Sequence, residues 1–364
     1  MISLEDLYKV VAAVTPLYLA LALGYGAVKW WQTFKPEQID AINRFNYYFI
    51  SPFFAFDFTS HINPYKLNLR FIFADIISKA IIIIVLLIWA NCTRHGNYSW
   101  FVTCFSLSSL NNTLVVGVPL LRAMYGQLGA DLVVQSFVIQ SLLWFITLLF
   151  LLELHRARNS FASQFDNNNK VTDEFQGHIV SVEDQESMGH SIETSKAATP
   201  PFFYLMKTVT LKLVQNPNVY SCIIGITWSL ISNKWHIDMP TIVEGSILIF
   251  SKAGAGVAMF SMGLFMALQE KFISCGVRLM IFGLVLRFVV GSITMAIGSI
   301  ALGLRGTVLR VAILQAALPQ SITAFVFAKE YGLHASVLST TVSFGTILSL
   351  PILIGYYSIL ETLR

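Results

Sequence analysis

Two short polar clusters stand in the middle of long apolar stretches of the chain. The first is Asn111-Asn-Thr113, and the second is Pro319-Gln320, which follows Gln315. Proline removes a backbone donor and clashes with the preceding turn, and asparagine can bond the backbone locally, so each cluster predicts a helix that breaks in mid-membrane. Half-helix N-termini that meet at such breaks carry partial positive charge, and the amides add neutral donors. The chemistry predicted is the binding of a small anion without a lysine or arginine.

A purely structural interpretation of these residues stays open. Pro319 would then be a kink, and Asn112 would form a hydrogen bond between helices. The binding interpretation is favoured because the two clusters fall at matching places in two halves of the chain, and a break in lipid leaves backbone groups that only another helix or a watered cavity can satisfy.

Asp75 and Lys79 are a second polar feature, again inside an apolar stretch. They are four residues apart, so they share one helix face and can pair. Burial of either charge alone would be costly in a membrane. The pair fits an ion pair that fixes helix packing, and it fits equally well a proton-responsive or gating support beside a substrate path.

Composition decides which classes of protein are excluded. Of the 364 residues, 55% are hydrophobic and 12% are charged, and the net charge is +4. The charged surface is too small for a soluble enzyme, and the scattered basic residues make no nucleic-acid footprint. The four cysteines lie far apart with no metal-ligand spacing, and no nucleotide-binding or hydrolase motif occurs, so we expect no enzyme, no cofactor and no metal. The chain is expected to be an all-α, multi-span membrane protein.

Ten apolar stretches are long enough to cross a bilayer, which needs about 20 residues per helix. They cover residues 7–29, 39–59, 69–91, 100–124, 131–154, 204–231, 241–268, 274–303, 306–330 and 334–360. The polar segment 155–203 divides them into a first repeat of five (1–154) and a second (204–364), and its composition predicts one short flexible loop.

The two halves share weak motifs in the same order. Tyr125-Gly126 follows the first cluster, and Tyr331-Gly332 follows the second. Five spans are an odd number, so the second repeat enters the membrane upside down, which is a transporter architecture with a site between the repeats. Basic residues favour a cytosolic loop, with both termini in a lumen or outside the cell. The sequon at Asn97 then faces the cytosol and stays unmodified, and the first stretch is expected to be a retained helix rather than a signal peptide.

Several longer motifs resemble the plant PIN-FORMED auxin efflux carriers. They are Asn216-Pro-Asn-Val-Tyr220, the stretch 258–267, Thr113-Leu-Val-Val-Gly-Val-Pro-Leu-Leu121 and the region from Gln315 to Tyr331. The similarity covers both membrane halves, and the short central loop is similar to that of the family members of the endoplasmic reticulum.

The resemblance implies ten helices in two inverted repeats, with helices 4 and 9 broken and crossing. Helices 1, 2, 6 and 7 would form a scaffold, and helices 3–5 and 8–10 a transport domain that works as an elevator in a homodimer within membrane lipid. The implied substrate is indole-3-acetate or a related aromatic carboxylate, moved as the anion without sodium or proton. The implied location is the endoplasmic reticulum membrane, with the plasma membrane as the alternative.

The resemblance also assigns roles to residues. Those expected to bind substrate are Asn112, Asn218, Gln320, Ser51, Gln140, Phe145 and Val326; the crossover residues are Asn111 and Pro319; the support site is Asp75 and Lys79. The chain departs from the family where Asn111 and Ala324 replace typical prolines. It departs again where Ala55 and Phe145 replace the serine and tyrosine of some members. Without the resemblance, Gln140 with Trp144 and Phe145 could line an aromatic wall of the site, but an aromatic stripe of this kind is more often part of the core or in contact with lipid.

Two other functions are weighed against potential-driven auxin export from the cytosol. A sodium-coupled organic-anion symporter, similar to bile acid transporters, would need a carboxylate-rich ion site, and Asp75 is nearly alone. A non-transporting ligand sensor would bind the same anion without turnover. A monoanion that crosses the membrane moves one charge, worth about 2.3 kcal/mol per 100 mV, so the membrane potential alone could bias net export from the cytosol.

Overall fold

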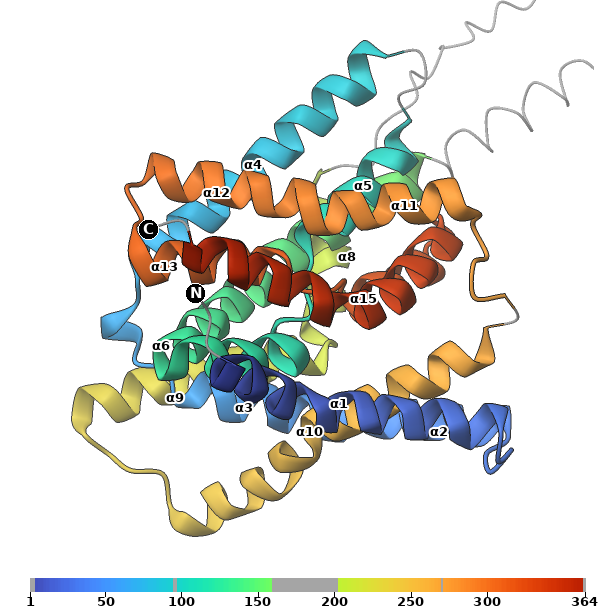
Figure 1. The fold of residues 1–364 in the computed structure, drawn as a ribbon. Coiled ribbons are helices and arrows are strands. Elements are labelled where there is room, and N and C mark those ends of the chain that lie inside the picture. Colours follow the sequence, from blue (N-terminus) through green and yellow to red (C-terminus); the bar gives the residue numbers. More distant parts are fainter. Residues whose placement is uncertain (1–3, 94–96, 159–201, 270, 363–364) are drawn as a thin grey trace, which may run out of the picture.

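The computed structural model describes residues 4–93, 97–158, 202–269 and 271–362, and every regular element within these ranges is a helix (Figure 1). Nearly all of the predicted loop 155–203 lies outside the described residues. The helices of the first half are α1 (Leu4–Lys29), α2 (Pro36–Phe45), η1 (Asn46–Ile50), α3 (Ser51–Ser60), η2 (Pro64–Lys66), α4 (Leu69–Cys92), α5 (Tyr98–Ser109), η3 (Thr113–Gly117), α6 (Val118–Ile139) and η4 (Gln140–Trp144), with further helix over 145–158. Those of the second half are α8 (Phe202–Val214), α9 (Pro217–Trp235), α10 (Thr241–Leu268), α11 (Val277–Val285), η5 (Leu286–Val290), α12 (Gly291–Ala301), α13 (Gly306–Ala316), α14 (Ile322–Glu330) and α15 (Ala335–Thr362).

Six helices in the described residues are long and apolar enough to span a membrane. They cover Leu7–Lys29, Leu69–Cys92, Thr113–Arg158, Thr241–Leu268, Val277–Ala301 and Ala335–Thr362. The protein is therefore an all-helical, multi-span membrane protein, and the count of ten stays a prediction. Interruptions explain three of the four missing spans: 100–124, 204–231 and 306–330 are each divided into shorter helices, whereas the span 39–59 lies within continuous helix over 36–60 that is not among the six. Gly126, with φ 66° and ψ −149°, kinks the long run 113–158 between two predicted spans.

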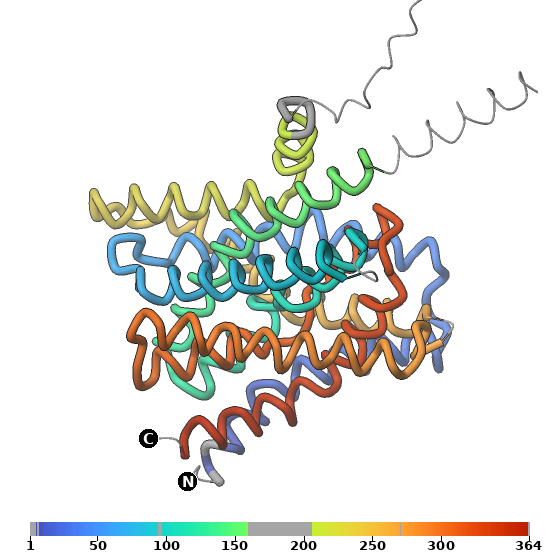
Figure 2. Tube along the Cα trace, turned by 90° about the horizontal axis from the view of Figure 1, so that it is seen from above, coloured from blue at the N-terminus to red at the C-terminus, as the bar shows by residue number. Residues whose placement is uncertain are grey.

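The helices form two groups that lie side by side (Figures 1 and 2). In one group α1 packs on α10, and α3 packs on α9 and α10. In the other group α4, α5, α12 and α13 pack together, and α11 packs on α15. The broken region after α5 lies between the groups, because α6 contacts α1 and α3 on one side and α13 on the other.

Glycine sets how closely the first group packs. A Cβ added at Gly263 of α10 would run into the backbone of Leu21 and Tyr25 in α1, and one at Gly24 into the backbone of Phe260 in α10. Only a residue without a side chain lets two helix backbones approach so closely. These two positions therefore hold α1 and α10 in direct backbone contact.

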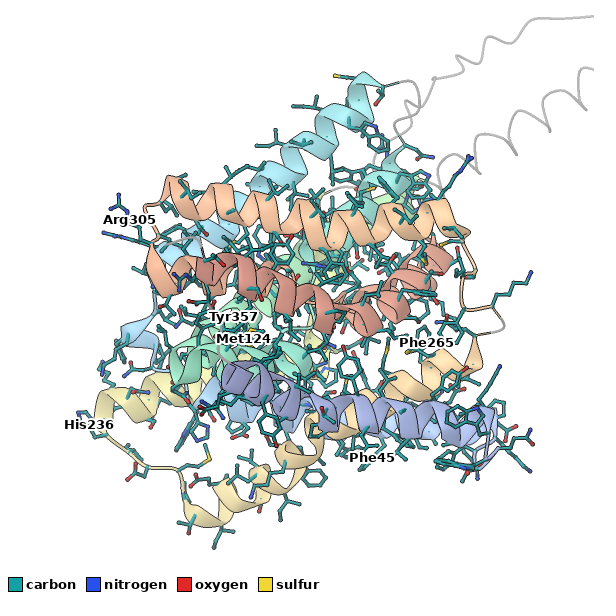
Figure 3. All side chains as sticks on the ribbon, in the orientation of Figure 1. Phe45, Met124, His236, Phe265, Arg305 and Tyr357 are labelled. Atoms are coloured by element: carbon teal, nitrogen blue, oxygen red, sulfur yellow. The ribbon has the colours of Figure 1, made fainter. Side chains whose placement is uncertain are left out.

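The connections between helices gather at two ends of the molecule. Figures 1 and 2 place the α1–α2, α10–α11 and α14–α15 connections at one end, and the α3–α4, α9–α10 and α12–α13 connections at the other. His236 and Arg305, labelled in Figure 3, mark the second end. The polar groups described below lie between these two ends.

Candidate anion-binding site

The two predicted breaks face each other and pair through their backbones. α5 ends at Ser109 and helix resumes at Thr113, while α13 ends at Ala316 and helix resumes at Ile322. Between them Asn111 and Gln320 form an isolated antiparallel β-bridge. The Asn112 N–H donates to the Pro319 carbonyl at 2.9 Å, and the Ser321 N–H donates to the Leu110 carbonyl at 3.2 Å. Backbone groups that the breaks expose are thus satisfied by the opposite break.

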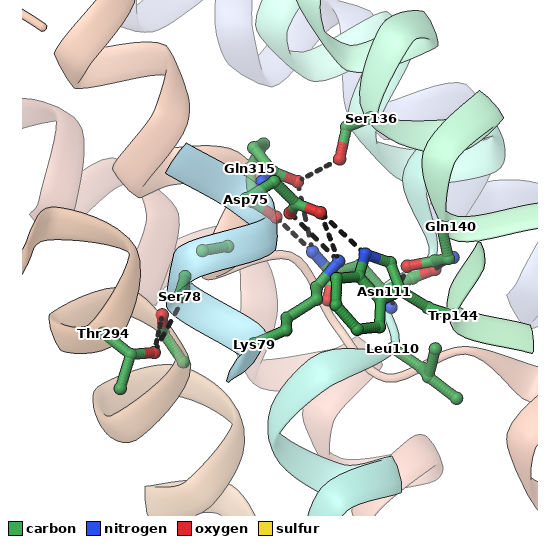
Figure 4. A network of polar contacts seen from close by, with 12 residues as sticks. Asp75, Ser78, Lys79, Leu110, Asn111, Ser136, Gln140, Trp144, Thr294 and Gln315 are labelled. Carbon is green, nitrogen blue, oxygen red and sulfur yellow. Dashed lines mark hydrogen bonds and ion pairs between the residues drawn. The ribbon is translucent and has the colours of Figure 1, made fainter. Parts of the chain in front are cut away.

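Amide side chains hold the first break in place (Figure 4). Gln140 accepts from the Asn111 N–H at 2.8 Å and donates to the Asn111 carbonyl at 2.7 Å. The Asn111 side chain donates to the Gln315 carbonyl at 2.6 Å, and Ser136 donates to the Gln315 side chain at 2.8 Å. A proline at this position would have no N–H to give Gln140, so the two-bond clamp requires a residue such as Asn111 that keeps its backbone donor.

A buried arginine binds the other ends of the broken helices. Arg287 lies in the π-turn η5 and is 1% exposed. Its guanidinium donates to the carbonyls of Leu107 and Leu110 at the end of α5, at 3.3 and 3.2 Å, and to the carbonyl of Ala316 at the end of α13. Sequence reasoning missed this role. The signal was a lone charge within an apolar stretch, but its partners are backbone atoms, which no sequence pattern reveals.

Asp75 and Lys79 form an ion pair deep in the same group of helices (Figure 4). Both are buried, and the ammonium lies 3.0 Å from the carboxylate. The indole N–H of Trp144 donates to the same carboxylate at 2.8 Å, and the ammonium lies over the Trp144 ring. The pair thus reaches from α4 to η4, whose first residue is the Gln140 that holds Asn111.

A cavity of about 120 Å³ lies where the breaks meet the first group of helices. Its walls come from α3 and α9 on one side and from the first break, η4 and the start of α14 on the other. The residues that line it are Ser51, Phe54, Ala55, Asn111, Asn112, Thr113, Leu114, Val115, Phe137, Gln140, Ser141, Phe145, Asn216, Asn218, Val219, Ser321 and Thr323. The lining therefore combines amide and hydroxyl side chains with phenylalanine rings.

Three polar side chains in this lining have donors to spare. Within the described residues, no hydrogen bond is made by the side-chain amides of Asn112 and Asn218, and the buried Ser141 hydroxyl has no partner either. Helix starts at Thr113 and Ile322 add N–H groups that have no partner inside their own helices. This arrangement can hold a carboxylate through uncharged donors.

The structure brings together most, but not all, of the expected substrate residues. Ser51, Asn112, Gln140, Phe145 and Asn218 line one cavity. Gln320 does not: it is fully buried, and its amide donates to the Ser106 carbonyl at 3.0 Å. Val326 is also outside the lining, with 50% of its surface exposed on α14.

Comparison with known proteins places the chain in a family. Residues 9–357 match the family model described as "Membrane transport protein". The chain is 55% identical to "Auxin efflux carrier component 5" of Arabidopsis thaliana, with 99% of each chain covered. It is 51% identical to "Probable auxin efflux carrier component 5a" of Oryza sativa subsp. japonica over the whole of both chains, and 37% identical to "Auxin efflux carrier component 8" of Arabidopsis thaliana. Such relatives are transporters rather than enzymes, and the chain belongs to the membrane transport protein family, among its PIN-FORMED auxin efflux carriers and close to component 5.

Proposed function

We propose that the protein carries auxin, as the indole-3-acetate anion, out of the cytosol by facilitated transport. The observation that supports this most directly is the cavity between the two groups of helices, whose lining combines the amides of Asn112 and Asn218 with phenylalanine rings. An aromatic monocarboxylate has the two matching parts. The relatives' names, which are those of auxin efflux carriers, point to the same substrate.

In the proposed complex the carboxylate meets Asn112 and Asn218, and the indole ring lies against Phe54, Phe137 and Phe145. The helix starts at Thr113 and Ile322 add partial positive charge there. A fixed arginine in the cavity would bind the anion more tightly and release it more slowly. Neutral donors suit a carrier because release is part of every cycle.

The movement we propose is that of an elevator. The group built from α1, α3, α9 and α10 would be the scaffold, and the group that carries the two breaks would move against it. Support comes from the position of the cavity, which has walls from both groups. Ten helices in two inverted repeats and a homodimer belong to the same proposal, as does residence in the endoplasmic reticulum with the loop 155–203 in the cytosol.

The membrane potential is the driving force in this proposal. The anion moves one charge across the membrane, worth about 2.3 kcal/mol per 100 mV, and no coupled ion is needed. Asp75 and Lys79 would support the moving group, because their charges are paired to each other rather than turned to the cavity.

Current measured on a solid-supported membrane with the reconstituted protein tests the proposal. Indole-3-acetate should give saturable currents that do not depend on sodium or on a pH gradient. Currents that need sodium would favour a symporter instead. Binding of indole-3-acetate without any current or flux in proteoliposomes would favour a ligand sensor.

A further inference from the structure

The ends of the broken helices carry charges that cancel. At the crossing, α5 and α13 present their C-terminal ends, and the helices that begin at Thr113 and Ile322 present their N-terminal ends. Each end is equivalent to roughly half an elementary charge, negative at the C-terminus and positive at the N-terminus. Taken alone, the four ends add up to about zero, so the breaks by themselves give an anion little net attraction.

Arg287 removes this balance. Its guanidinium donates to carbonyls at both C-terminal ends: those of Leu107 in α5 and of Leu110, which caps α5, and that of Ala316, the last residue of α13. The one positive charge of Arg287 offsets the negative half-charges of the two C-terminal ends. The two N-terminal ends then carry about one positive charge in total that is not offset. Arg287 does not line the cavity, so it would act on a ligand without touching it.

No carboxylate in the described residues neutralises Arg287. It forms no ion pair there, and the nearby Asp75 is engaged by Lys79 and Trp144. A fully buried arginine without a carboxylate is costly, and the carbonyl groups are what stabilise it. Its charge is therefore available to the helix ends and to whatever occupies the cavity.

The surroundings of Arg287 suit an arginine side chain and the glycine one helical turn after it, Gly291. The planar guanidinium donates to three carbonyls at the ends of two helices. The ammonium of a lysine is a single point of charge and would reach fewer of them. One turn later, a Cβ added at Gly291 would lie 2.8 Å from the Ser108 carbonyl oxygen and 3.5 Å from that of Ala316. Gly291 thus lets the backbone of this helix come up against both broken ends and brings Arg287 within hydrogen-bonding distance.

We propose that Arg287 is a positioning residue. It lies outside the cavity, and its charge makes the cavity prefer anions. The proposal rests on the proposed function, because it assigns the source of charge for the same carboxylate site. It explains how a cavity with only neutral side chains in its lining can select an anion.

The test compares an acid with its neutral amide in binding to purified full-length protein. Arg287→Gln keeps hydrogen-bond donors but removes the charge, and Arg287→Lys keeps the charge with a different shape. Arg278→Gln is the matched control, since Arg278 is exposed at the start of the same helical run. The ligands are indole-3-acetate and indole-3-acetamide, with 1-naphthaleneacetate and its amide as a second pair.

We expect Arg287→Gln to weaken acid binding about ten-fold and amide binding less than about two-fold, whereas Arg287→Lys keeps most of the acid preference. Arg278→Gln should match the unmodified protein. An Arg287→Gln protein that keeps the full preference for acid over amide would overturn the proposal. So would an Arg287→Lys protein that loses acid and amide equally, or the failure of both variants to fold, because either result makes Arg287 a structural clamp only.

The two proposals fail in different ways. If the unmodified protein does not bind indole-3-acetate, the proposed function is wrong, and the naphthalene pair still reports the charge preference of the cavity. If it binds indole-3-acetate and Arg287→Gln leaves the acid preference intact, only the role of Arg287 is wrong.

Discussion

The side-chain amide of Gln140 hydrogen bonds to both backbone groups of Asn111, at 2.8 Å through its oxygen and at 2.7 Å through its nitrogen. A side chain thereby acts like the neighbouring strand of a sheet and holds one extended residue between two helices. Because both polar atoms of Gln140 are engaged, its main contribution is to the shape of the site, although it also lines the cavity.

Gln140→Leu should therefore lower stability first and transport as a consequence. The substitution leaves the buried N–H and carbonyl of Asn111 unpaired, at a cost of about 1–3 kcal/mol each. Thermal unfolding in detergent measures the loss as a lower Tm. Gln127→Leu is the control: the hydrogen bonds of Gln127 with Arg122 and Asp131 are exposed to solvent, so water can replace them, and its Tm should stay close to that of the unmodified protein. Equal Tm values for the two variants would contradict the clamp.

Asn112→Ala should abolish saturable indole-3-acetate currents without changing expression or Tm. The Asn112 amide lines the cavity and has no hydrogen bond to lose within the described residues, so its removal costs binding and little stability. Asn43→Ala on α2 is the matched control and should transport normally. Unchanged currents in Asn112→Ala would refute the assignment of the carboxylate site.

Trp144→Phe should destabilise the protein by about 1.5–3 kcal/mol. The ring is kept, but the indole N–H that donates to Asp75 at 2.8 Å is lost, and hydrogen bonds to a charged group are worth about this much. Trp228→Phe is the control, because the Trp228 indole N–H makes no hydrogen bond within the described part of the chain. A denaturant titration followed by fluorescence measures both, and a loss of the same size in Trp228→Phe would rule out the Asp75 contact as the cause.

His61 makes stability depend on pH at the end of α3. Its imidazole lies 3.3 Å from the Asp57 carboxylate, and the hydrogen bond to Asp57 raises the pKa of His61 from 6.5 to about 9. Because the pKa is higher in the folded state, the stabilisation is fully present below pH about 6.5 and is lost as the pH rises through about 9. Tm should fall over that range, and the fall should be smaller in His61→Gln. His236→Gln, at an exposed helix end, should keep the full pH dependence.

Gly263→Ala should separate α1 from α10, because the added Cβ meets the backbone of Leu21 and Tyr25. Overpacking of this kind costs about 1–3 kcal/mol or more. Gly245→Ala in the same helix meets nothing within 4 Å, so the better helix propensity of alanine should leave Tm equal or raise it slightly. A lower Tm for Gly245→Ala than for Gly263→Ala would contradict the close contact.

The helix breaks and the ion pair could be anticipated because their causes are local. Pro319 and the paired asparagines weaken a helix wherever they stand, and the structure interrupts helix at both places. Asp75 and Lys79 are four residues apart, so helix geometry alone brings them together. The chain's membership of the PIN-FORMED family, inferred from longer motifs, is confirmed.

Contacts across the fold could not be anticipated in the same way. Whether Gln320 faces the cavity or the Ser106 carbonyl depends on the rotation of a short non-helical segment, which residue type does not determine. The partners of Arg287 are backbone oxygens that lie 180 and 177 residues before it and 29 residues after it. Such a contact depends on the packing of helices, and no motif records it.

The hydrogen bond from Asn112 to Pro319 has a consequence for how the protein is made. Its two residues lie on opposite sides of the long polar segment, so the ribosome releases the first break well before it has synthesised the second. During that interval the backbone N–H of Asn112 lacks the Pro319 carbonyl that accepts its hydrogen bond. An unpaired backbone group is costly in the hydrocarbon of a bilayer. The first break can therefore reach its final hydrogen bonding only after the C-terminal half has been made. Until then, water or the insertion machinery must supply hydrogen-bond partners to its backbone.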